Sequence, residues 1–408
     1  MPSRTEKAYG VLIIVIMLSL IAGCGGDDKP MSHGKVKIGM LFPLSGELAD
    51  KGKDSVNGVT LAAEEINASG GIAALGGAKL DLIAGDTRGN PDIGVQETGR
   101  LITDQGAVAI IGAYQSSVAK PASQVAERLE TPFIISAAVA DVITERGFRY
   151  TFRVLPKAQF YGRDQARFLA DLGQLADYPV KQVALLHENT DFGTSVALAQ
   201  KKALRDTGLN MIAEVSYVAE GATDLSKEVA QVLAAKPDAI LEVTYLKDSI
   251  LIRRAMTKAG ATIPLVDSAG GTVSPEYIQT LKQSAEGTLT SSEYSKYTAE
   301  GKILNARFRA RFGVDITGDS AYSYQAVWVI KDALERARSL DKKKLRQALA
   351  ATDMPKGPHM ILPAERLRFD AQGQNEFARL FIVQIQDGEL VPVWPAEYAV
   401  AKVRLKKR

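Results

Sequence analysis

The chain has 408 residues, of which 46% are hydrophobic and 24% are charged, and its formal net charge is +3. A charge this small does not favour a nucleic-acid partner. The composition is that of a soluble globular protein, and the length predicts two domains that each bury a core.

The amino-terminal segment has the layout of a secretory signal. Arg4 and Lys7 precede an apolar run from Val11 to Ala22, and small residues follow that run. A helix of this length reaches about 18 Å, whereas the hydrocarbon core of a bilayer is about 30 Å thick. The run is therefore too short for a permanent transmembrane anchor.

Cys24 is the only cysteine in the chain, so it can form neither an intramolecular disulfide nor a zinc pair. The tetrapeptide "IAGC", residues 21–24, resembles a bacterial lipobox, which implies cleavage before Cys24 and lipidation of its sulfur. The alternative is an ordinary signal peptide with a chance cysteine. We expect a signal peptide over 1–23, a lipidated tether over 24–34, and a mature chain held on the periplasmic or cell-surface side of a bacterial membrane.

Past the tether, predicted strands and helices alternate. Apolar runs mark the strands, and apolar residues at helical spacing, ended by glycines, mark the helices. The run "AVAIIG" is apolar throughout, as expected for a strand buried on both faces of a parallel sheet. The strands of this first series are predicted at 36–42, 79–86, 107–112 and 132–136, with helices around 56–66, 92–106 and 125–129.

A second series of the same kind begins near Pro156. Strands that alternate with helices of this length predict βαβ units and parallel sheets. Two similar series therefore predict an α/β fold of two lobes. The strands of the second series are predicted at 182–188, 210–218, 238–245 and 263–268, with helices around 162–173, 192–208, 224–237 and 248–260.

After about Glu286 the order of elements changes. Three helices come almost consecutively, and three strands follow them. This tail is too small for a third domain of the same kind, so we expect it to complete the first two lobes. The helices are predicted around Ala306, Val327 and Leu345, and the strands at 366–370, 378–385 and 390–395.

The motifs of common cofactor and catalytic sites are missing from the sequence. No G-x-G-x-x-G follows the first strand, and neither G-x-x-x-x-G-K-[ST] nor G-x-S-x-G occurs. The three histidines, His33, His187 and His359, are scattered and form no metal-ligand pair at helical spacing. An enzyme is possible, but no motif favours one, and we expect no cofactor and no metal.

One strand-to-helix turn, "AIIGAYQSSVAKP", is suited to bind an anion. Ser116 and Ser117 lie where the helix should start, and Pro121 is expected in its first turn. Free backbone N–H groups, a serine hydroxyl and the positive end of the helix dipole would bind a small carboxylate. The alternative is that one of the serines is simply an N-cap.

The chain from Lys35 to about Pro395 resembles the leucine/isoleucine/valine-binding type of periplasmic solute receptor. No single motif would suffice, but their order and spacing are specific in combination. The motifs are "IGMLFPLSGELADKG", "NGVTLAAEEINASGGI", "AIIGAYQSSVAKPAS", "PFIISAAVADVITERGF", "NTDFG", "PDAILEVTY" and "AEGTLT".

The resemblance implies two Rossmann-like lobes with parallel sheets, joined by three crossovers, which is the type I periplasmic binding protein fold. Lobe 1 would comprise 35–154 and 291–380, and lobe 2 would comprise 155–290 and 381–408. Ligand would bind in the cleft between the lobes.

The resemblance also implies function and motion. Such receptors are not enzymes; they pass a ligand to an ABC permease in the membrane, and we expect a monomer. The crossovers near Leu155, Leu289 and Leu380 would act as hinges that close the lobes. A rival interpretation is a sensor subunit that uses the same closure to signal to a membrane partner.

Several positions match the family's ligand-binding pattern. Ser116 matches the serine that holds the ligand carboxylate, and the Ser136–Ala140 segment matches the next strand-end loop, whose backbone groups hold the carboxylate and ammonium. Tyr245 matches a tyrosine that closes over the ligand, and Lys51 falls where an aromatic lid is common. The candidate ligand-binding residues are Lys51, Tyr114, Gln115, Ser116, Ser117, Ala137, Ala138, Val139, Phe192, Tyr245, Asp267 and Ala269.

The sequence departs from the amino-acid-binding pattern at two positions. Val139 or Ala140 replaces the usual threonine, and Ala269 replaces the acidic residue that holds the α-ammonium; Asp267, two residues away, is a candidate to compensate. An unpaired buried cation is costly. Together with Lys51 at the cleft mouth, these changes favour an acidic or non-amino ligand, while a standard amino acid and another small carboxylate, such as an aromatic acid, both stay open.

Overall fold

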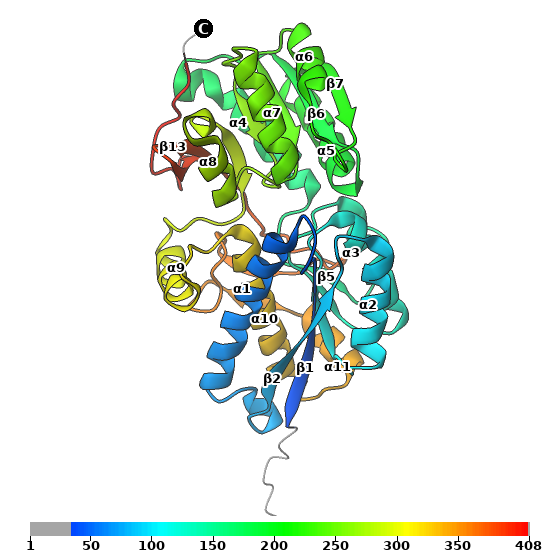
Figure 1. Ribbon diagram of the computed structural model, residues 1–408. Coiled ribbons are helices and arrows are strands. Elements are labelled where there is room, and N and C mark those ends of the chain that lie inside the picture. Colours follow the sequence, from blue (N-terminus) through cyan, green and yellow to red (C-terminus); the bar gives the residue numbers. More distant parts are fainter. Residues whose placement is uncertain (1–33, 407–408) are drawn as a thin grey trace, which may run out of the picture.

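Two separate sheets, each covered by helices, divide residues 34–406, which the computed structural model describes, into two lobes (Figure 1). The predicted signal peptide and Cys24 lie outside the described residues. Within 34–406, no helix combines the length and the apolar character needed to cross a membrane.

The sheet of lobe 1 has five parallel strands in the order β2-β1-β3-β4-β5. Every residue of β3 is buried, which confirms the prediction from its apolar run. The strands are β1 (Lys35–Phe42), β2 (Lys79–Asp86), β3 (Ala109–Gly112), β4 (Phe133–Ile135) and β5 (Thr151–Arg153). The helices and 3-10 turns of this lobe are α1 (Ala49–Ala68), η1 (Ala73–Leu75), α2 (Pro91–Thr103), α3 (Ser116–Arg128), η2 (Asp141–Ile143), α9 (Ala299–Phe312), α10 (Gly318–Ala337) and α11 (Lys342–Ala350).

The sheet of lobe 2 has seven strands in the order β14-β13-β10-β9-β8-β6-β7. Five run parallel, and the hairpin of β13 and β14 adds antiparallel to β10. The strands are β6 (Gln182–Glu188), β7 (Asn210–Tyr217), β8 (Ala239–Val243), β9 (Leu265–Asp267), β10 (Leu289–Ser292), β13 (Phe381–Gln386) and β14 (Glu389–Trp394). The helices are α4 (Ala158–Ala176), α5 (Asp191–Thr207), α6 (Ser226–Ala234), α7 (Leu246–Lys258), α8 (Pro275–Leu281) and the 3-10 turn η3 (Lys282–Ala285).

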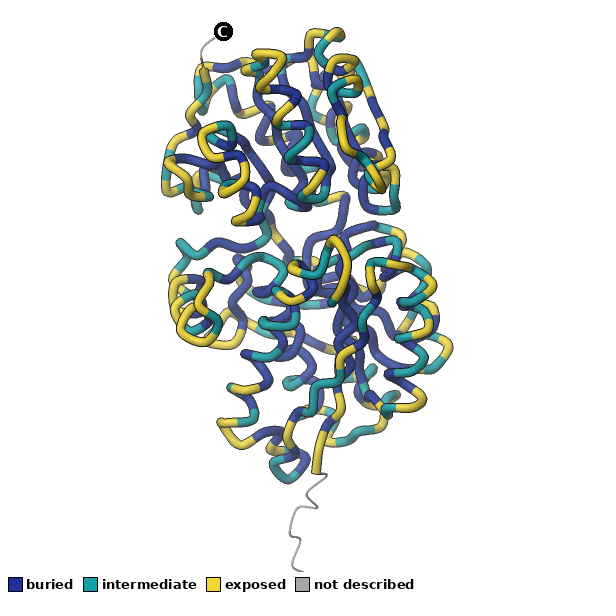
Figure 2. The backbone as a smooth tube through the Cα atoms, viewed as in Figure 1, coloured by how far each residue is buried: buried dark blue, intermediate teal, exposed yellow. Residues whose placement is uncertain are grey.

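Local sequence signals fix several helix ends. Asn90 caps α2 by accepting hydrogen bonds from the first backbone N–H groups, with Pro91 at the first helical position. Thr190 caps α5 in the same way, and Gly208 ends that helix in the left-handed conformation at φ 73°. Apolar faces of these helices pack on the sheets, so the buried residues concentrate inside each lobe (Figure 2).

Three segments cross between the lobes. They run through 154–157 between β5 and α4, through 293–298 between β10 and α9, and through 369–380 ahead of β13. Leu289 begins β10, so the second crossing starts after Ser292 and not at the predicted boundary of 290. A small antiparallel pair, β11 (Asp353–Pro355) and β12 (Arg366–Arg368), precedes the third crossing.

The predicted alternation is confirmed, with some differences. The sequence patterns missed the short strands β5, β10 and β11 and the short helix α8. Pro121 lies inside α3, beyond its first turn, so the predicted position is wrong; its missing N–H leaves the carbonyl of Ser117 without a helical partner. The predicted late helices correspond to α9, α10 and α11.

Candidate ligand-binding cleft

A narrow cavity of about 30 Å³ lies between the two lobes, where the carboxyl ends of their parallel strands meet. Both lobes and the second crossing contribute side chains to it. The lining residues are Tyr114, Ser116, Ala137, Val139, Tyr161, Phe192, Tyr245, Ser268, Ala269, Gly270, Glu293 and Asp319.

Contacts across the cleft hold the lobes together. The hydroxyl of Tyr114 donates a hydrogen bond to the carbonyl of Gly270 at 3.3 Å, and Lys120 pairs with Asp191 at 2.9 Å. A cavity of this volume has room for only about one or two water molecules. A solute of amino-acid size therefore needs the lobes to separate before it can enter.

Ser116 is placed to donate a hydrogen bond into the cavity. It is the first residue of α3, and the N-cap is Gln115, whose side chain makes no capping bond. The Ser116 Oγ accepts a hydrogen bond from the N–H of Ala140 at 3.2 Å. No acceptor in residues 34–406 takes up its hydroxyl hydrogen, so Ser116 is not an N-cap and keeps a free donor.

The loop after β4 offers further donors. The N–H of Ala138 bonds to the carbonyl of Ala113 at 3.2 Å, and the carbonyl of Val139 accepts from Ala158 at 2.8 Å. The N–H groups of Ala137 and Val139, which line the cavity, pair with no acceptor in the described part of the chain. Together with the hydroxyl of Ser116, these N–H groups are donors without an acceptor in residues 34–406, and such a set is suited to bind a carboxylate.

Three predicted residues in this region do not line the cavity. Gln115 points its amide to the carbonyl of Gly89 at 3.2 Å, while its buried Oε1 has no partner. Ser117 lies in the first turn of α3, directly after Ser116. Ala138 is buried. These residues support the cleft without contacting its interior.

The predicted aromatic residues do come together. Phe192 at the start of α5 and Tyr245 before α7 have ring centroids 5.3 Å apart, and Tyr245 lies 6.1 Å from Tyr114 of lobe 1. Burial raises the pKa of Tyr114 and Tyr245 well above the ordinary tyrosine value, so both hydroxyls stay protonated at neutral pH. The rings give the cavity an apolar wall.

Two carboxylates that the sequence patterns missed also line the cavity. Glu293 follows β10, and its Oε1 accepts a hydrogen bond from the hydroxyl of Tyr161. Burial, reinforced by the charge of Asp319, raises the pKa of Glu293 to about 7. Burial also raises the pKa of Asp319, although the charge of Lys51 opposes this effect.

Lys51 is not a solvated lysine at the cleft mouth. It is only 6% exposed, and its Nζ lies 3.5 Å from the Oδ2 of Asp319. Its charge is therefore opposed by an acid that itself lines the cavity. The sequence-based argument that Lys51 favours an acidic ligand loses its basis.

Asp267 occupies a different place from the one predicted. Its carboxylate accepts hydrogen bonds from the hydroxyls of Thr244 at 2.9 Å and Thr272 at 2.6 Å, and it does not line the cavity. Ala269 does line it, in the left-handed region at φ 64°. Two other acids, Glu293 and Asp319, line the cavity in which Ala269 lies.

The sequence held a signal for one of the two missed acids. Glu293 directly follows the strand that ends at Ser292, and strand ends of parallel sheets meet at the ligand edge. Asp319 lies in the first turn of α10 after the cap Thr317. No local pattern distinguishes this acid from an ordinary first-turn residue, so only the packing of α10 places it in the cleft.

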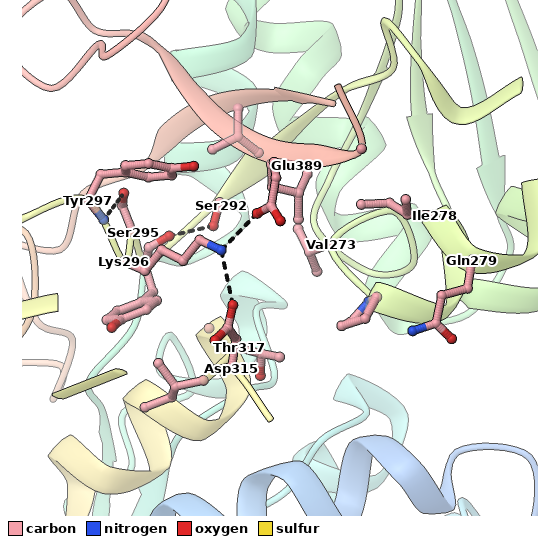
Figure 3. Close-up of a pocket in the computed structure, with 17 residues that line it drawn as sticks. Val273, Ile278, Gln279, Ser292, Ser295, Lys296, Tyr297, Asp315, Thr317 and Glu389 are labelled. Atoms are coloured by element: carbon pink, nitrogen blue, oxygen red, sulfur yellow. Dashed lines mark hydrogen bonds and ion pairs between the residues drawn. The ribbon is translucent and has the colours of Figure 1, made fainter. Parts of the chain in front are cut away.

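A larger pocket of about 300 Å³ lies next to this cavity (Figure 3). Ser292 and Gly318 line the larger pocket, and the residues that follow them, Glu293 and Asp319, line the narrow cavity. The Nζ of its Lys296 is already paired with Asp315 at 3.0 Å and with Glu389 at 2.8 Å. This pocket is larger than the narrow cavity. The narrow cavity is the better candidate, because Ser116 and the N–H groups of Ala137 and Val139 have no acceptor in residues 34–406 and lie in the same cavity as two carboxylates.

Comparisons with known proteins agree with this architecture. The model of the family described as "Periplasmic binding protein" matches residues 35–389. Leu/Ile/Val-binding protein homolog 7 of Brucella melitensis biotype 1 is 31% identical over 412 residues, which cover 97% of this chain and 98% of the relative.

Two solved structures share the fold. The branched-chain amino acid transporter substrate binding protein LivJ from Streptococcus pneumoniae, in complex with isoleucine, has a TM-score of 0.76 at 23% identity, covering 87% of this chain and 97% of that chain. A solute binding protein of an ABC transporter from R. palustris, in complex with benzoate, has a TM-score of 0.76 at 19% identity, covering 90% and 100%. The family match spans most of the sequence and the Brucella relative aligns over nearly its whole length, so this chain belongs to the periplasmic binding protein family and is a solute-binding protein of the Leu/Ile/Val-binding type.

Proposed function

We propose that this protein is the receptor of an ABC uptake system and that its ligand is an amino acid, held as a zwitterion in the cleft between the lobes. The observation that carries the proposal is the charge arrangement of the cavity. Free donors of lobe 1 and the carboxylates of Glu293 and Asp319 line the same small space. A molecule with both a carboxylate and an ammonium group would satisfy both sets.

The carboxylate would bind to lobe 1. The hydroxyl of Ser116 and the N–H groups of Ala137 and Val139 are the available donors, and the amino-terminal end of α3 adds its dipole. These donors come from two neighbouring strand ends, β3 and β4, so one carboxylate could reach all three.

The ammonium would bind to Glu293 and Asp319. Burial makes both carboxylates costly to ionise, and the charge of Lys51, which pairs with Asp319, offsets only part of that cost. A ligand ammonium would lower the pKa of Glu293 and stabilise its charged form. This arrangement replaces the family's acidic position, which Ala269 occupies here.

The rings of Tyr114, Phe192 and Tyr245 would cover the apolar part of the ligand. The name of the Brucella relatives and the isoleucine bound to the Streptococcus neighbour support a branched-chain side chain. The same aromatic wall also supports a second candidate, an aromatic carboxylate such as the benzoate bound to the R. palustris neighbour. That candidate would bring no cation to Glu293 and leave Asp319 with Lys51 alone.

A thermal-shift screen separates these candidates, because a bound ligand stabilises the folded state by mass action. Each branched-chain amino acid is compared with its deaminated acid, its decarboxylated amine and benzoate. We expect the amino acid to raise the melting temperature and the two truncated analogues to have little effect. A larger shift with benzoate or the deaminated acid would reject the zwitterion and favour the aromatic or non-amino carboxylate.

The role in transport is supported by the family and is distinguished from sensing by the membrane partner. If a permease and an ATPase are encoded beside this protein, reconstitution with them should give ligand uptake that depends on it. Uptake that is unchanged without the protein, together with a signalling response that needs it, would favour the sensor interpretation. A monomeric mass in solution is expected with and without ligand.

The lipid anchor is a separate proposal on Cys24, which lies outside the described residues. If Cys24 carries lipid, Cys24→Ser should move the protein from membranes to the soluble fraction, and the wild type should carry acyl mass on that cysteine. A wild type without acyl mass would reject the anchor and leave an ordinary signal peptide.

A further inference from the structure

Arg153 is a buried cation without a buried anion beside it. It is the last residue of β5, is 0% exposed, and donates four hydrogen bonds, all to uncharged acceptors. Burial lowers its pKa to about 10, and the charges of Asp141 and Glu145 only partly oppose this effect. Burying a guanidinium costs free energy. The role of the hydrogen bonds that hold it here therefore needs an explanation.

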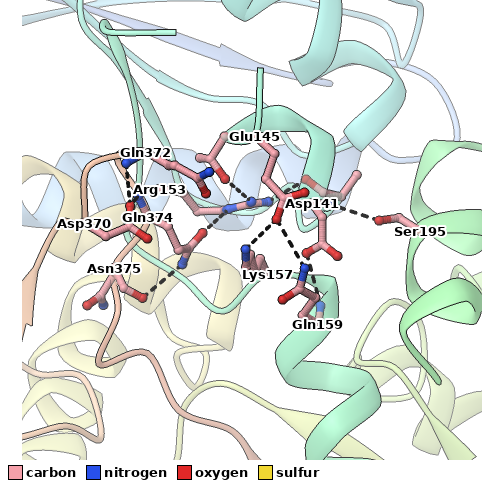
Figure 4. Close-up of polar contacts among 12 residues, drawn as sticks. Asp141, Glu145, Arg153, Lys157, Gln159, Ser195, Asp370, Gln372, Gln374 and Asn375 are labelled. Atoms are coloured by element: carbon pink, nitrogen blue, oxygen red, sulfur yellow. Dashed lines mark hydrogen bonds and ion pairs between the residues drawn. The ribbon is translucent and has the colours of Figure 1, made fainter. Parts of the chain in front are cut away.

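Two of those partners are carbonyls of the ligand-binding loop. The Nη1 of Arg153 donates to the carbonyl of Ala138 at 3.2 Å and to that of Ala140 at 2.9 Å. Figure 4 shows Arg153 beside another of its partners, Gln374. In a trans peptide unit the C=O and the following N–H point in opposite directions. Holding these two carbonyls therefore also fixes the directions of the N–H groups of Val139 and Asp141.

The two N–H groups point to different places. Val139 lines the cavity, and its N–H has no partner in the described chain, so it is available to a ligand. The N–H of Asp141 donates to the Oγ of Ser195 on α5 of lobe 2 at 3.1 Å. Arg153 thus orients both the Val139 N–H, which is available to a ligand, and the hydrogen bond between Asp141 and Ser195, which joins the lobes.

The other end of the network reaches two crossings between the lobes. The Nε of Arg153 donates to the Oε1 of Gln374 at 2.7 Å, and the Nε2 of Gln374 donates to the carbonyl of Leu155 at 2.8 Å. Asn375 likewise donates to the carbonyl of Val154 at 2.9 Å. The first and third crossings are therefore fastened side by side next to the guanidinium.

We infer that Arg153 is a positioning residue that couples the ligand-binding loop to the hinge, so that it controls lobe closure as well as affinity. It does not contact the ligand. Its guanidinium orients the Ala138–Val139 and Ala140–Asp141 peptide units and joins them through Gln374 to the crossings. The inference goes beyond the proposed function, since any ligand that uses the Val139 N–H would depend on it.

Arg153→Lys keeps the charge but cannot hold two carbonyls and two side chains at once.

Closure is read from the distance between spin labels on cysteines at 47 and 247, in the full chain with Cys24→Ser. Glu47 and Lys247 face each other across the cleft, with side chains 75% and 49% exposed. Because Cys24 is the only native cysteine, only the two new thiols take the labels.

The probe is an equimolar mixture of the twenty standard L-amino acids. In Arg153→Lys we expect the concentration for half-maximal closure to rise about tenfold or more, the change expected when a charge-assisted hydrogen bond is lost. Amide hydrogen exchange over residues 136–141 should be faster even without ligand. Gln374→Leu should keep the slow exchange of that loop and still weaken closure, because it removes only the link to the crossings.

Arg253→Lys is the matched control. Its guanidinium also donates to backbone carbonyls, those of Ser284 and Glu286, but in lobe 2 away from the cleft. It should close like the wild type even if its melting temperature falls. Wild-type closure and wild-type loop exchange in Arg153→Lys, or wild-type closure in Gln374→Leu, would overturn the inference. If the wild type ignores the mixture, the amino-acid assignment fails, and the exchange measurement still decides the role of Arg153.

Discussion

The two lobes differ in the sign of their least exposed charges. In the described part of lobe 1 these are the cations Lys51 and Arg153, and Lys157 is buried in the first crossing, whereas Asp319 of α10 keeps 19% of its side chain exposed at the cleft. In lobe 2 the buried charged side chains are acids, and most are held by hydroxyl groups; for example, Asp248 accepts a hydrogen bond from Tyr217 at 2.6 Å. These acids are Asp164, Glu188, Glu242, Asp248 and Asp267.

The comparison shows that a buried charge does not by itself define a ligand site. The acids of lobe 2 are directed into its own interior, whereas Glu293 and Asp319, which line the cleft, come from the second crossing and from α10. The cation Arg153 is also turned away from the cleft, yet it leaves a backbone N–H free to bind an anion. What matters is which group faces the cavity with a hydrogen-bonding capacity that the protein does not use.

The largest expected effect separates an acid of the cleft from an acid of the interior. Glu293→Gln should weaken amino-acid binding by roughly 2–5 kcal/mol, the cost of removing one partner of a buried charge pair. Glu242→Gln, which alters an acid on β8 outside the cavity, should leave the affinity nearly unchanged. Isothermal titration calorimetry measures both, and equal losses in the two variants would break the distinction.

The donor side of the cleft should respond to a slightly smaller degree. Ser116→Ala removes a hydroxyl that would bond to a charged carboxylate, so affinity should fall by roughly 1.5–3 kcal/mol. The fold should survive, because the Ser116 Oγ only accepts from Ala140 and caps no helix. Ser117→Ala is the matched control, and a loss confined to that control would move the anion site away from Ser116.

A third prediction concerns the stability of lobe 2. Both carboxylate oxygens of Glu242 are buried without a hydrogen-bond partner, and burial raises its pKa well above the ordinary value. Glu242→Met should therefore stabilise the protein by about 1–3 kcal/mol at pH 8. Asp267→Asn, which disturbs an acid held by threonine hydroxyls, should instead destabilise it.

The sign of the pH dependence follows from the raised pKa. The folded state holds the proton of Glu242 more tightly than the unfolded state, so this stabilisation is complete below the unfolded pKa of about 4.3 and is lost as the pH rises toward the folded value. The advantage of Glu242→Met should grow with pH in denaturant titrations. A constant difference from pH 5 to 9 would mean that Glu242 is ionised in the folded state throughout this range, which would contradict the raised pKa.

The smallest effect is the pH dependence of binding. With a pKa of about 7 in the free protein, Glu293 is mostly protonated at pH 6 and must lose its proton to bind an ammonium. Affinity should fall about tenfold from pH 8 to pH 6, and the dependence should disappear in Glu293→Gln. A rise in affinity toward pH 6 would favour an anionic ligand.

The fold and one side of the site could be predicted because their signals are local. The alternation of strands and helices follows from short apolar periods, and Ser116 follows the end of a strand in a parallel sheet. Phe192, Tyr245, Ala137, Val139 and Ala269 were found through the family resemblance, and the structure brings them to the same cavity as Ser116.

The charged side of the site could not be predicted from such patterns. Lys51 looked like a surface lysine because its partner, Asp319, is distant in sequence and reaches it only through the packing of α1 on α10. Asp267 looked available, but its threonine partners come from the ends of β8 and from the segment after β9. Contacts between segments that are distant in sequence decide which charged groups have partners. Short hydrophobic patterns in the sequence do not show these contacts.

A crystal structure of the protein with its bound ligand tests the central claim most directly. The account predicts a ligand carboxylate about 2.7–3.2 Å from the Ser116 Oγ and the Val139 N, with a ligand nitrogen at hydrogen-bond distance from Glu293 or Asp319. A ligand that lacks a nitrogen, or one that turns its carboxylate toward Glu293, would contradict it.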